Sequence, residues 1–175
     1  MQLSIQSMIP FPIAKVYEAM RDHLPELAKY MPNIESIEVI SKVNENNVLQ
    51  IVNQWNPAET EIPKVAQPFI QADKIFWKDY ATWTDAEYSC SWRLEMGFMP
   101  ERVTCVGRTY FIQLDENRTE MRVEGDLTLE LQGLVPRLIL GKATKVVETF
   151  VSKLVQPNFQ KTTQALIDYL RETNN

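Results

Sequence analysis

The chain has 175 residues, of which 18 are basic and 23 acidic, and its formal net charge is −5. A chain of this length folds most economically as one domain, residues 1–175, with a core that needs neither a disulfide nor a metal ion. The acidic balance argues against nonspecific nucleic-acid binding, because such binding requires a basic surface.

The N-terminal part of the chain predicts one strand followed by two short helices. Residues 2–9 alternate loosely between polar and apolar side chains, and Pro10 ends this strand. Pro12 suits the first turn of the next helix. A second helix is predicted for residues 24–31, where Pro32 stops it. Both helices are too short to be stable alone, so we expect them to pack on the rest of the domain.

Alternation of apolar and polar side chains predicts six further strands. They are expected at residues 34–43, 48–55, 76–84, 87–96, 102–114 and 119–131. The last strand has one apolar and one charged face, which indicates an antiparallel sheet with water on one side. Glu45-Asn46-Asn47 predicts the turn between the first two of these strands, because asparagine tolerates left-handed backbone angles.

The connection Asn56–Ile75 is the least regular part of the chain. It contains Pro57, Pro63 and Pro68, and a short helical pattern at residues 65–70. At about twenty residues it is longer than ordinary connections, which favours a functional lid or an insertion.

A long amphipathic helix is predicted for residues 136–173. Apolar side chains recur at steps of three and four over residues 139–154, and the pattern resumes over residues 159–170. Pro157 lies between the two parts and lacks the N–H of a helix interior. We therefore expect the helix to kink or break there, with Asn158 placed to cap the second part.

The order of these elements resembles the helix-grip fold of the START and polyketide-cyclase superfamily (SRPBCC), which also contains the birch-pollen allergen. The local cues are the helix start Pro12–Tyr17 (PIAKVY), the passage Met31–Ile37 (MPNIESI), the late strand segment Gly125–Leu127 (GDL) and the terminal helix. The resemblance covers essentially the whole chain. It implies an α+β fold in which a curved antiparallel sheet of six or seven strands wraps around the long C-terminal helix, with two short helices after the first strand.

The resemblance also implies a hydrophobic cavity between sheet and helix that takes a lipid, sterol, polyketide, quinone or similar ligand. The Asn56–Ile75 insertion departs from the shorter members of the superfamily. A pocket for such a ligand would need roughly 300 Å³ or more.

Aromatic side chains on the predicted strands and the last helix are the candidate ligand contacts. They are Trp55, Trp77, Tyr80, Trp83, Tyr88, Trp92, Tyr110 and Phe150. A cavity lined in this way would hold a flat, apolar ligand and orient it by a few polar contacts. The alternative is that these side chains simply fill a wide core.

Asp79 is the best candidate for a catalytic acid or base, because burial beside Trp77 and Tyr80 would raise the pKa of its carboxyl. Tyr80 or Tyr110 would then supply a polar handle. The same burial also fits a purely structural role for Asp79. His23 is the single histidine, and its place at a predicted helix end favours a surface role.

The sequence lacks the residue spacing that is typical of metal sites. Cys90 and Cys105 both fall in predicted strands, and the sequence has no CxxC motif and no Cys/His cluster. We therefore expect no metal site and no other cofactor.

The entry to the last helix combines apolar and basic side chains. Residues 131–141 hold more apolar side chains than one helix face can bury, and residues 134–161 have five basic side chains and one acidic, a net charge of +4. Such a segment could contact an anionic membrane or gate the mouth of the cavity. Alternatively, its lysines are simply solvated.

The leading functional hypothesis is noncatalytic binding or transport of a hydrophobic small molecule. The main alternative is an enzyme of the cyclase or dehydratase type that acts in the same cavity, since confinement and one acid or base can suffice for such chemistry. The third hypothesis is a protein-interaction role, in which the outer face of the sheet or the Asn56–Ile75 insertion binds a partner chain. The chain shows no signal-peptide pattern and no run of 18 apolar residues. We therefore expect a cytoplasmic monomer or homodimer.

Overall fold

The computed structural model describes residues 1–46, 48–58, 64, 67, 70–134 and 136–174. Seven strands in these ranges form one antiparallel sheet, which confirms the predicted helix-grip fold. The strands are β1 (Gln2–Ile9), β2 (Ile34–Glu45), β3 (Val48–Pro57), β4 (Trp77–Thr84), β5 (Ser89–Met96), β6 (Val103–Asp115) and β7 (Arg118–Leu129). The helices are α1 (Ile13–Asp22), α2 (Leu24–Leu27) and α3 (Arg137–Thr173), with 3-10 turns η1 (Ala28–Tyr30), η2 (Ala72–Lys74) and η3 (Asp85–Glu87).

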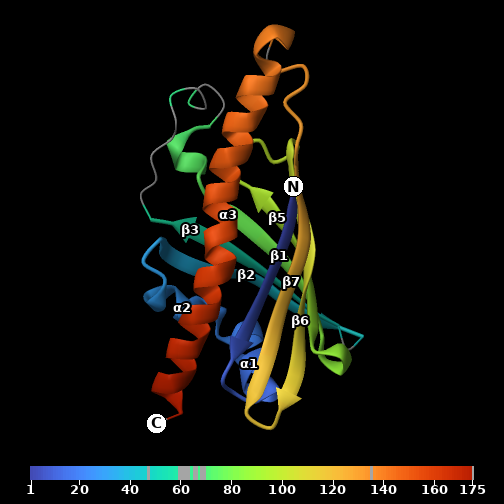
Figure 1. Cartoon of the computed structure of the whole chain (residues 1–175), viewed down its shortest axis with the longest axis vertical. Helices are drawn as coiled ribbons and strands as arrows, with labels where there is room; N and C mark the ends of the chain where they lie inside the picture. The colour runs from blue at the N-terminus through green and yellow to red at the C-terminus, as the bar shows by residue number, and fades with distance from the viewer. Residues whose placement is uncertain (47, 59–63, 65–66, 68–69, 135, 175) are drawn as a thin grey trace.

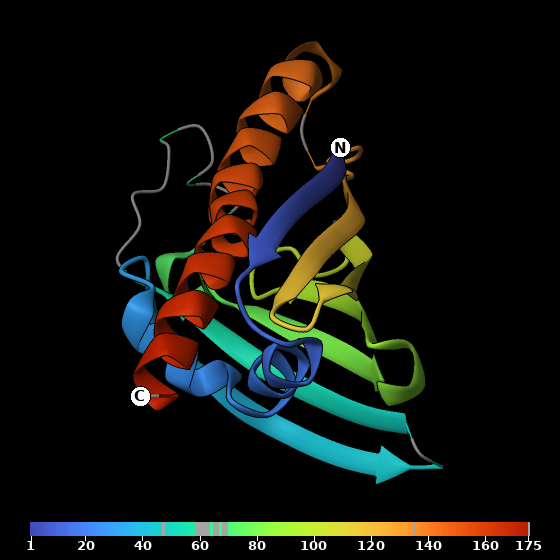
Figure 2. The ribbon, with the colours of Figure 1, turned by 60° about the horizontal axis from the view of Figure 1, so that its bottom comes forward.

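The sheet runs in the order β1-β7-β6-β5-β4-β3-β2, and every neighbouring pair of strands is antiparallel. The first strand of the chain therefore lies beside the last, and β2 forms the opposite edge. The sheet curves around α3, which crosses its inner face (Figure 1). The short helices α1 and α2 contact α3 and lie beside its C-terminal half (Figure 2).

Besides the lid or insertion predicted at Asn56–Ile75, two sequence predictions concern residues that lie partly outside the described ranges. The first is the turn Glu45-Asn46-Asn47, in which Asn46 has the expected left-handed backbone with φ of 52°. The second is the helical pattern at residues 65–70, most of which is not described. The N-terminal helices agree with the prediction: α1 begins directly after Pro12, and α2 with η1 occupies residues 24–30.

The sequence predicted a kink or a break at Pro157. Helix α3 continues through this proline as one helix of 37 residues, so a break is wrong. Asn158 is not a cap. It is buried inside the helix, where its Nδ2 donates to the carbonyl of Leu154 and its Oδ1 accepts from the Nδ2 of Asn33. Side chains beyond the proline, such as Leu166, are fully buried. Tertiary packing therefore holds the helix together where its own hydrogen bonding is interrupted.

Two glycines on neighbouring strands set the position of Trp92 on the inner face of the sheet. Gly107 of β6 pairs with Gly125 of β7, and Trp92 of β5 pairs with Gly107. A Cβ atom on either glycine would collide with the Trp92 ring, and at Gly125 it would lie 2.7 Å from Cη2. The indole therefore occupies space that any larger residue at these two positions would take.

We expect Gly107→Ala to destabilise the fold by about 1–3 kcal/mol, because the added methyl group forces the Trp92 ring or the neighbouring strand to move. Chemical unfolding followed by circular dichroism measures the change. Gly141→Ala is the matched control, since a Cβ there meets nothing within 4 Å and alanine favours the helix. Equal stability of the Gly107→Ala variant and the parent would contradict the placement of Trp92.

Candidate functional site

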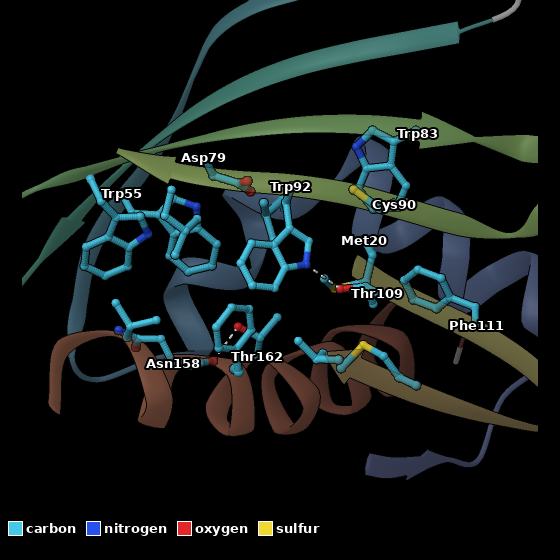
Figure 3. Close-up of a pocket in the computed structure, with 17 residues that line it drawn as sticks. Met20, Trp55, Asp79, Trp83, Cys90, Trp92, Thr109, Phe111, Asn158 and Thr162 are labelled. Carbon is cyan, nitrogen blue, oxygen red and sulfur yellow. Dashed lines mark hydrogen bonds between the residues drawn. The ribbon is translucent and has the colours of Figure 1, made fainter. Parts of the chain in front are cut away.

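A cavity of about 80 Å³ lies between the inner face of the sheet, α1 and α3 (Figure 3). Strands β3 to β7 provide one wall, Met20 of α1 closes one side, and Val155 and Phe159 of α3 belong to the opposite wall. The volume is well below the roughly 300 Å³ expected of a ligand pocket. The large side chains of the inner face account for the difference, because they occupy most of the space under the helix.

All four tryptophans of the chain line this cavity: Trp55, Trp77, Trp83 and Trp92. None is more than 7% exposed. Trp55 of β3 and Trp77 of β4 stack with their ring centroids 5.7 Å apart, and Trp92 packs against Phe159 of α3 at 5.1 Å. The alternating side-chain direction of a strand explains the gathering, because each of these residues has the inward parity of its strand.

Three polar atoms in the cavity wall are buried and have no hydrogen-bond partner in the described part of the chain. They are the indole Nε1 of Trp55, the indole Nε1 of Trp83 and Oδ1 of Asp79. Trp92 differs from these, because its Nε1 donates to Oγ1 of Thr109 at 3.1 Å. Buried polar groups without partners are rare in folded proteins and cost stability, so each of them needs an explanation.

Asp79 projects from β4 towards the cavity, as Figure 3 shows. Its neighbours across the sheet are Asn53 on β3 and Leu94 on β5. The residue as a whole is half-buried, whereas its Oδ1 has no access to solvent. No cation pairs with its carboxyl among the described residues, and burial raises its pKa to about 7. At neutral pH this carboxyl therefore exists in both protonation states and can donate or accept a proton.

The structure corrects the placement of two predicted ligand contacts on strands. Tyr80 and Tyr110 lie on the outer face of the sheet, because their parity is opposite to that of the cavity-lining residues of β4 and β6. The Arg93 guanidinium lies 4.1 Å from the centroid of the Tyr80 ring, and the Arg108 guanidinium lies 5.3 Å from that of Tyr110. Neither tyrosine can serve as the polar handle inside the cavity.

Two other predicted contacts also lie outside the cavity wall. Tyr88 follows η3 with a left-handed φ of 47°, is 37% exposed and packs edge-on against Tyr17 at 5.1 Å. Phe150 is buried, but it packs against Phe98 at 6.0 Å rather than facing the cavity. Of the eight predicted aromatic contacts, the structure therefore brings the four tryptophans together and leaves the other four elsewhere.

The part of the chain that the structure describes holds no group of three or more histidine, cysteine or carboxylate side chains that could bind a metal ion. Cys90 lines the cavity, and burial raises the pKa of its thiol. Among the described residues, no helix is long and apolar enough to cross a membrane.

Comparison with known proteins gives matches in structure alone: no family model and no curated protein matches the sequence. The protein TTHA0849 from Thermus thermophilus has a TM-score of 0.70 at 18% identity, with all of both chains covered. The Zhui aromatase/cyclase from Streptomyces sp. R1128 has a TM-score of 0.68 at 15% identity, covering 100% of this chain and 96% of that one. Norcoclaurine synthase from Thalictrum flavum, in complex with dopamine and hydroxybenzaldehyde, has a TM-score of 0.62 at 9% identity, covering 98% and 87%.

The chain has a helix-grip fold like that of an aromatase/cyclase and of a START superfamily protein from Mycobacterium smegmatis. At such identities the likeness concerns the fold, so the activity has to be argued from the residues of this chain.

Sequence reasoning missed several residues that line the helix-grip cavity, among them Met20, Thr109, Asn158, Phe159 and Thr162. Thr109 shares the parity of Val103, Cys105 and Phe111, but this strand also has apolar residues on the opposite parity, so the sequence did not show which face points inward. Asn158 and Thr162 lie four residues apart on the stripe of α3 that faces the sheet. Their polar character hid them from a search for apolar periodicity.

We expect Asp79→Asn to stabilise the protein at high pH and to leave it nearly unchanged at low pH. The ordinary pKa of this carboxyl is 3.8, and the folded value is about 7, so the folded state binds more protons between these values. The stability that protonated Asp79 contributes is therefore complete below pH about 4 and is lost as the pH rises through about 7.

Urea unfolding at pH 4, 6 and 8 measures this effect. The variant should gain about 2–4 kcal/mol over the parent at pH 8 and much less at pH 4. Asp73→Asn is the control, because that aspartate is exposed on η2. A stability difference that stays constant with pH would show that the Asp79 carboxyl is not desolvated as described.

Proposed function

We propose that this protein binds a small, mainly apolar and aromatic molecule in the cavity between the sheet and α3. The observation that carries the proposal is the set of unpartnered polar atoms at Trp55, Asp79 and Trp83, which face a wall that is otherwise largely apolar. Ligand sites combine such an apolar wall with a few convergent polar groups. A molecule with a hydroxyl or carbonyl group would satisfy atoms that have no partner among the described residues.

Two of the similar structures support an aromatic ligand. One is an aromatase/cyclase, and another holds dopamine and hydroxybenzaldehyde, which are hydroxylated aromatic molecules. The stacked pair Trp55 and Trp77 offers this chain its own flat apolar surface. Aromatic faces of this kind favour flat ligands over branched ones.

The size of the cavity limits the ligand. About 80 Å³ is less than the roughly 150 Å³ of a cavity that takes up benzene, so even a one-ring or two-ring aromatic ligand requires some side chains to move, and a lipid requires more movement. Met20 and Phe159 are half-buried members of the two helical walls, and methionine adapts its shape at low cost. We infer that any larger ligand enters by displacing these two side chains rather than those of the sheet.

A matched pair of probes tests the polar part of the proposal: 4-methylphenol and toluene, which differ by one hydroxyl group. The phenol should bind roughly tenfold more tightly, because its hydroxyl donates to the unpartnered Asp79 oxygen. Since all four tryptophans line the cavity, their emission reports binding directly, and calorimetry supplies the affinity.

The decisive variant is Asp79→Leu, which keeps the approximate shape of the side chain and removes its acceptor. It should bind toluene at least as well as the parent does and lose most of the preference for the phenol. Asp85→Leu is not a suitable control, since Asp85 accepts from Tyr17, so exposed Asp73→Leu is used instead. Failure of both probes to bind, or an unchanged preference in the Asp79→Leu variant, would count against the proposal.

A second candidate function is catalysis by Asp79 in the same cavity, for example in a cyclase or dehydratase reaction. The observation that favours it is the pKa of about 7 at a carboxyl that pairs with no cation in the described ranges. A group with this pKa is suited to general acid–base catalysis near neutral pH. The proposed role is that the carboxylate removes a proton from the bound substrate and the carboxylic acid returns it.

The proton-abstraction probe 5-nitrobenzisoxazole is small and aromatic, and its ring opens when a base removes the C–H proton. If Asp79 is an accessible base, the parent should accelerate this opening, and the rate should rise with pH through about 7 as the carboxyl ionises. The Asp79→Asn variant should return the rate to that of buffer. Equal rates for parent and variant would remove the base that this second function needs.

A further inference from the structure

The first turns of α3 extend beyond the body of the protein. From Pro136 to Lys142 every residue except Leu140 is exposed, and Ala143 is the first buried residue of the helix. At 1.5 Å per residue, the unpacked stretch from residue 137 to 143 is about 9 Å long. Figure 1 shows this end of α3 projecting past the strands. The side chains of these turns are therefore open to a contact from outside the domain.

The exposed tip presents large apolar side chains. Leu138 is 99% exposed, Ile139 is 50% exposed, and Leu134 in the preceding connection is 44% exposed. Single exposed apolar residues are common, but three within six positions, on a segment that leaves the domain, form a local patch. We call residues Leu134, Leu138 and Ile139 the apolar tip.

Basic side chains surround the apolar tip. Residues 136–145 contain Arg137, Lys142 and Lys145 and no acidic residue, whereas the whole chain has a net charge of −5. None of the three basic side chains forms an ion pair with any residue in the described ranges. The neighbouring connections add Arg102 against two carboxylates, so a positive excess remains at this end.

We propose that the apolar tip and its three basic neighbours dock the protein on an anionic lipid surface. The length of the projecting stretch matches the roughly 5–10 Å to which apolar side chains enter the interfacial region of a bilayer. Lysine and arginine beside the inserted residues gain attraction to anionic headgroups. A second copy seated tip to tip would instead bring like charges together, which opposes that occupant. This proposal does not depend on the cavity having a ligand.

Vesicle flotation tests the docking with the full chain. The probes are vesicles of phosphatidylcholine alone and vesicles of phosphatidylcholine with about 30% phosphatidylserine. We expect binding to the anionic vesicles that is at least about tenfold stronger than to the neutral ones and that weakens at about 0.5 M NaCl. Hydrogen exchange at residues 137–142 should slow on the anionic vesicles, because the lipid surface shields these exposed turns from water.

Two variants separate the apolar and the electrostatic parts. Leu138→Asp should reduce binding to anionic vesicles at least about tenfold, and the triple change Arg137→Gln, Lys142→Gln and Lys145→Gln should do the same. All four side chains are exposed, so both variants should unfold at the parent temperature. Val43→Asp is the matched control: it replaces an apolar side chain that is 45% exposed on β2, outside the apolar tip, and should bind like the parent.

Three results would overturn the proposal. One is equal flotation with neutral and anionic vesicles, or none with either. Another is full binding by the folded Leu138→Asp variant. The third is a dimer in light scattering that dissociates in the Leu138→Asp variant, since the tip would then be covered by a second copy of the chain.

Discussion

The fold depends on one geometric mismatch: a single helix covers a sheet that is much wider than the helix. Seven strands about 4.8 Å apart span roughly 29 Å, whereas a helix with its side chains is roughly 10–12 Å across. Burial of apolar side chains such as Val147, Val151 and Leu166 fixes α3 on the inner face. The rest of that face has to be covered by α1, by large side chains or by a ligand. The cavity is the space that these groups leave.

The four tryptophans provide most of the bulk that this wide inner face requires. They fill much of the space between the inner face and the helices, and Trp92 reaches Phe159 of α3. The absence of side chains at Gly107 and Gly125 makes room for Trp92. Filling is nearly complete, which explains why the cavity measures about 80 Å³ rather than several hundred. A core designed only for stability would not also retain a buried carboxyl at Asp79, since replacing it with an apolar residue removes the cost of desolvation. This cost is the physical reason for the binding or catalytic role proposed for Asp79.

Alternation along the chain was sufficient to predict the strands and the sheet class. Trp77 and Trp83 were candidate ligand contacts, and both line the cavity together with Asp79. The errors arose where aromatic character was given more weight than parity. Tyr80 is adjacent to Asp79 in sequence, and in a strand adjacent residues point to opposite faces. Tyr88 was assigned to a regular strand, but it adopts a left-handed conformation just before one.

Other properties of the site could not be predicted from local pattern. The volume of the cavity depends on how side chains from five strands and three helices interdigitate, and no single segment of sequence contains that information. Local sequence could not predict the continuity of α3 at Pro157 either. It depends on the tertiary contact of Asn158 with Asn33 and on the burial of Leu166. The local rule for proline is correct about the lost hydrogen bond, but packing outweighs that loss.

The proposed lipid-docking tip and the proposed ligand cavity lie on the same continuous helix, α3, but far apart along it. Leu138 at the tip and Val155 in the cavity wall lie on the same helix, about 17 residues and hence about 25 Å apart. This distance exceeds both the depth of an interfacial contact and the Debye length of about 8 Å at physiological salt. A lipid surface at the tip therefore cannot reach into the cavity or alter the ionisation of Asp79 directly. Docking would place the protein at a membrane, while the ligand would still enter the cavity through movement of Met20 and Phe159, far from the tip.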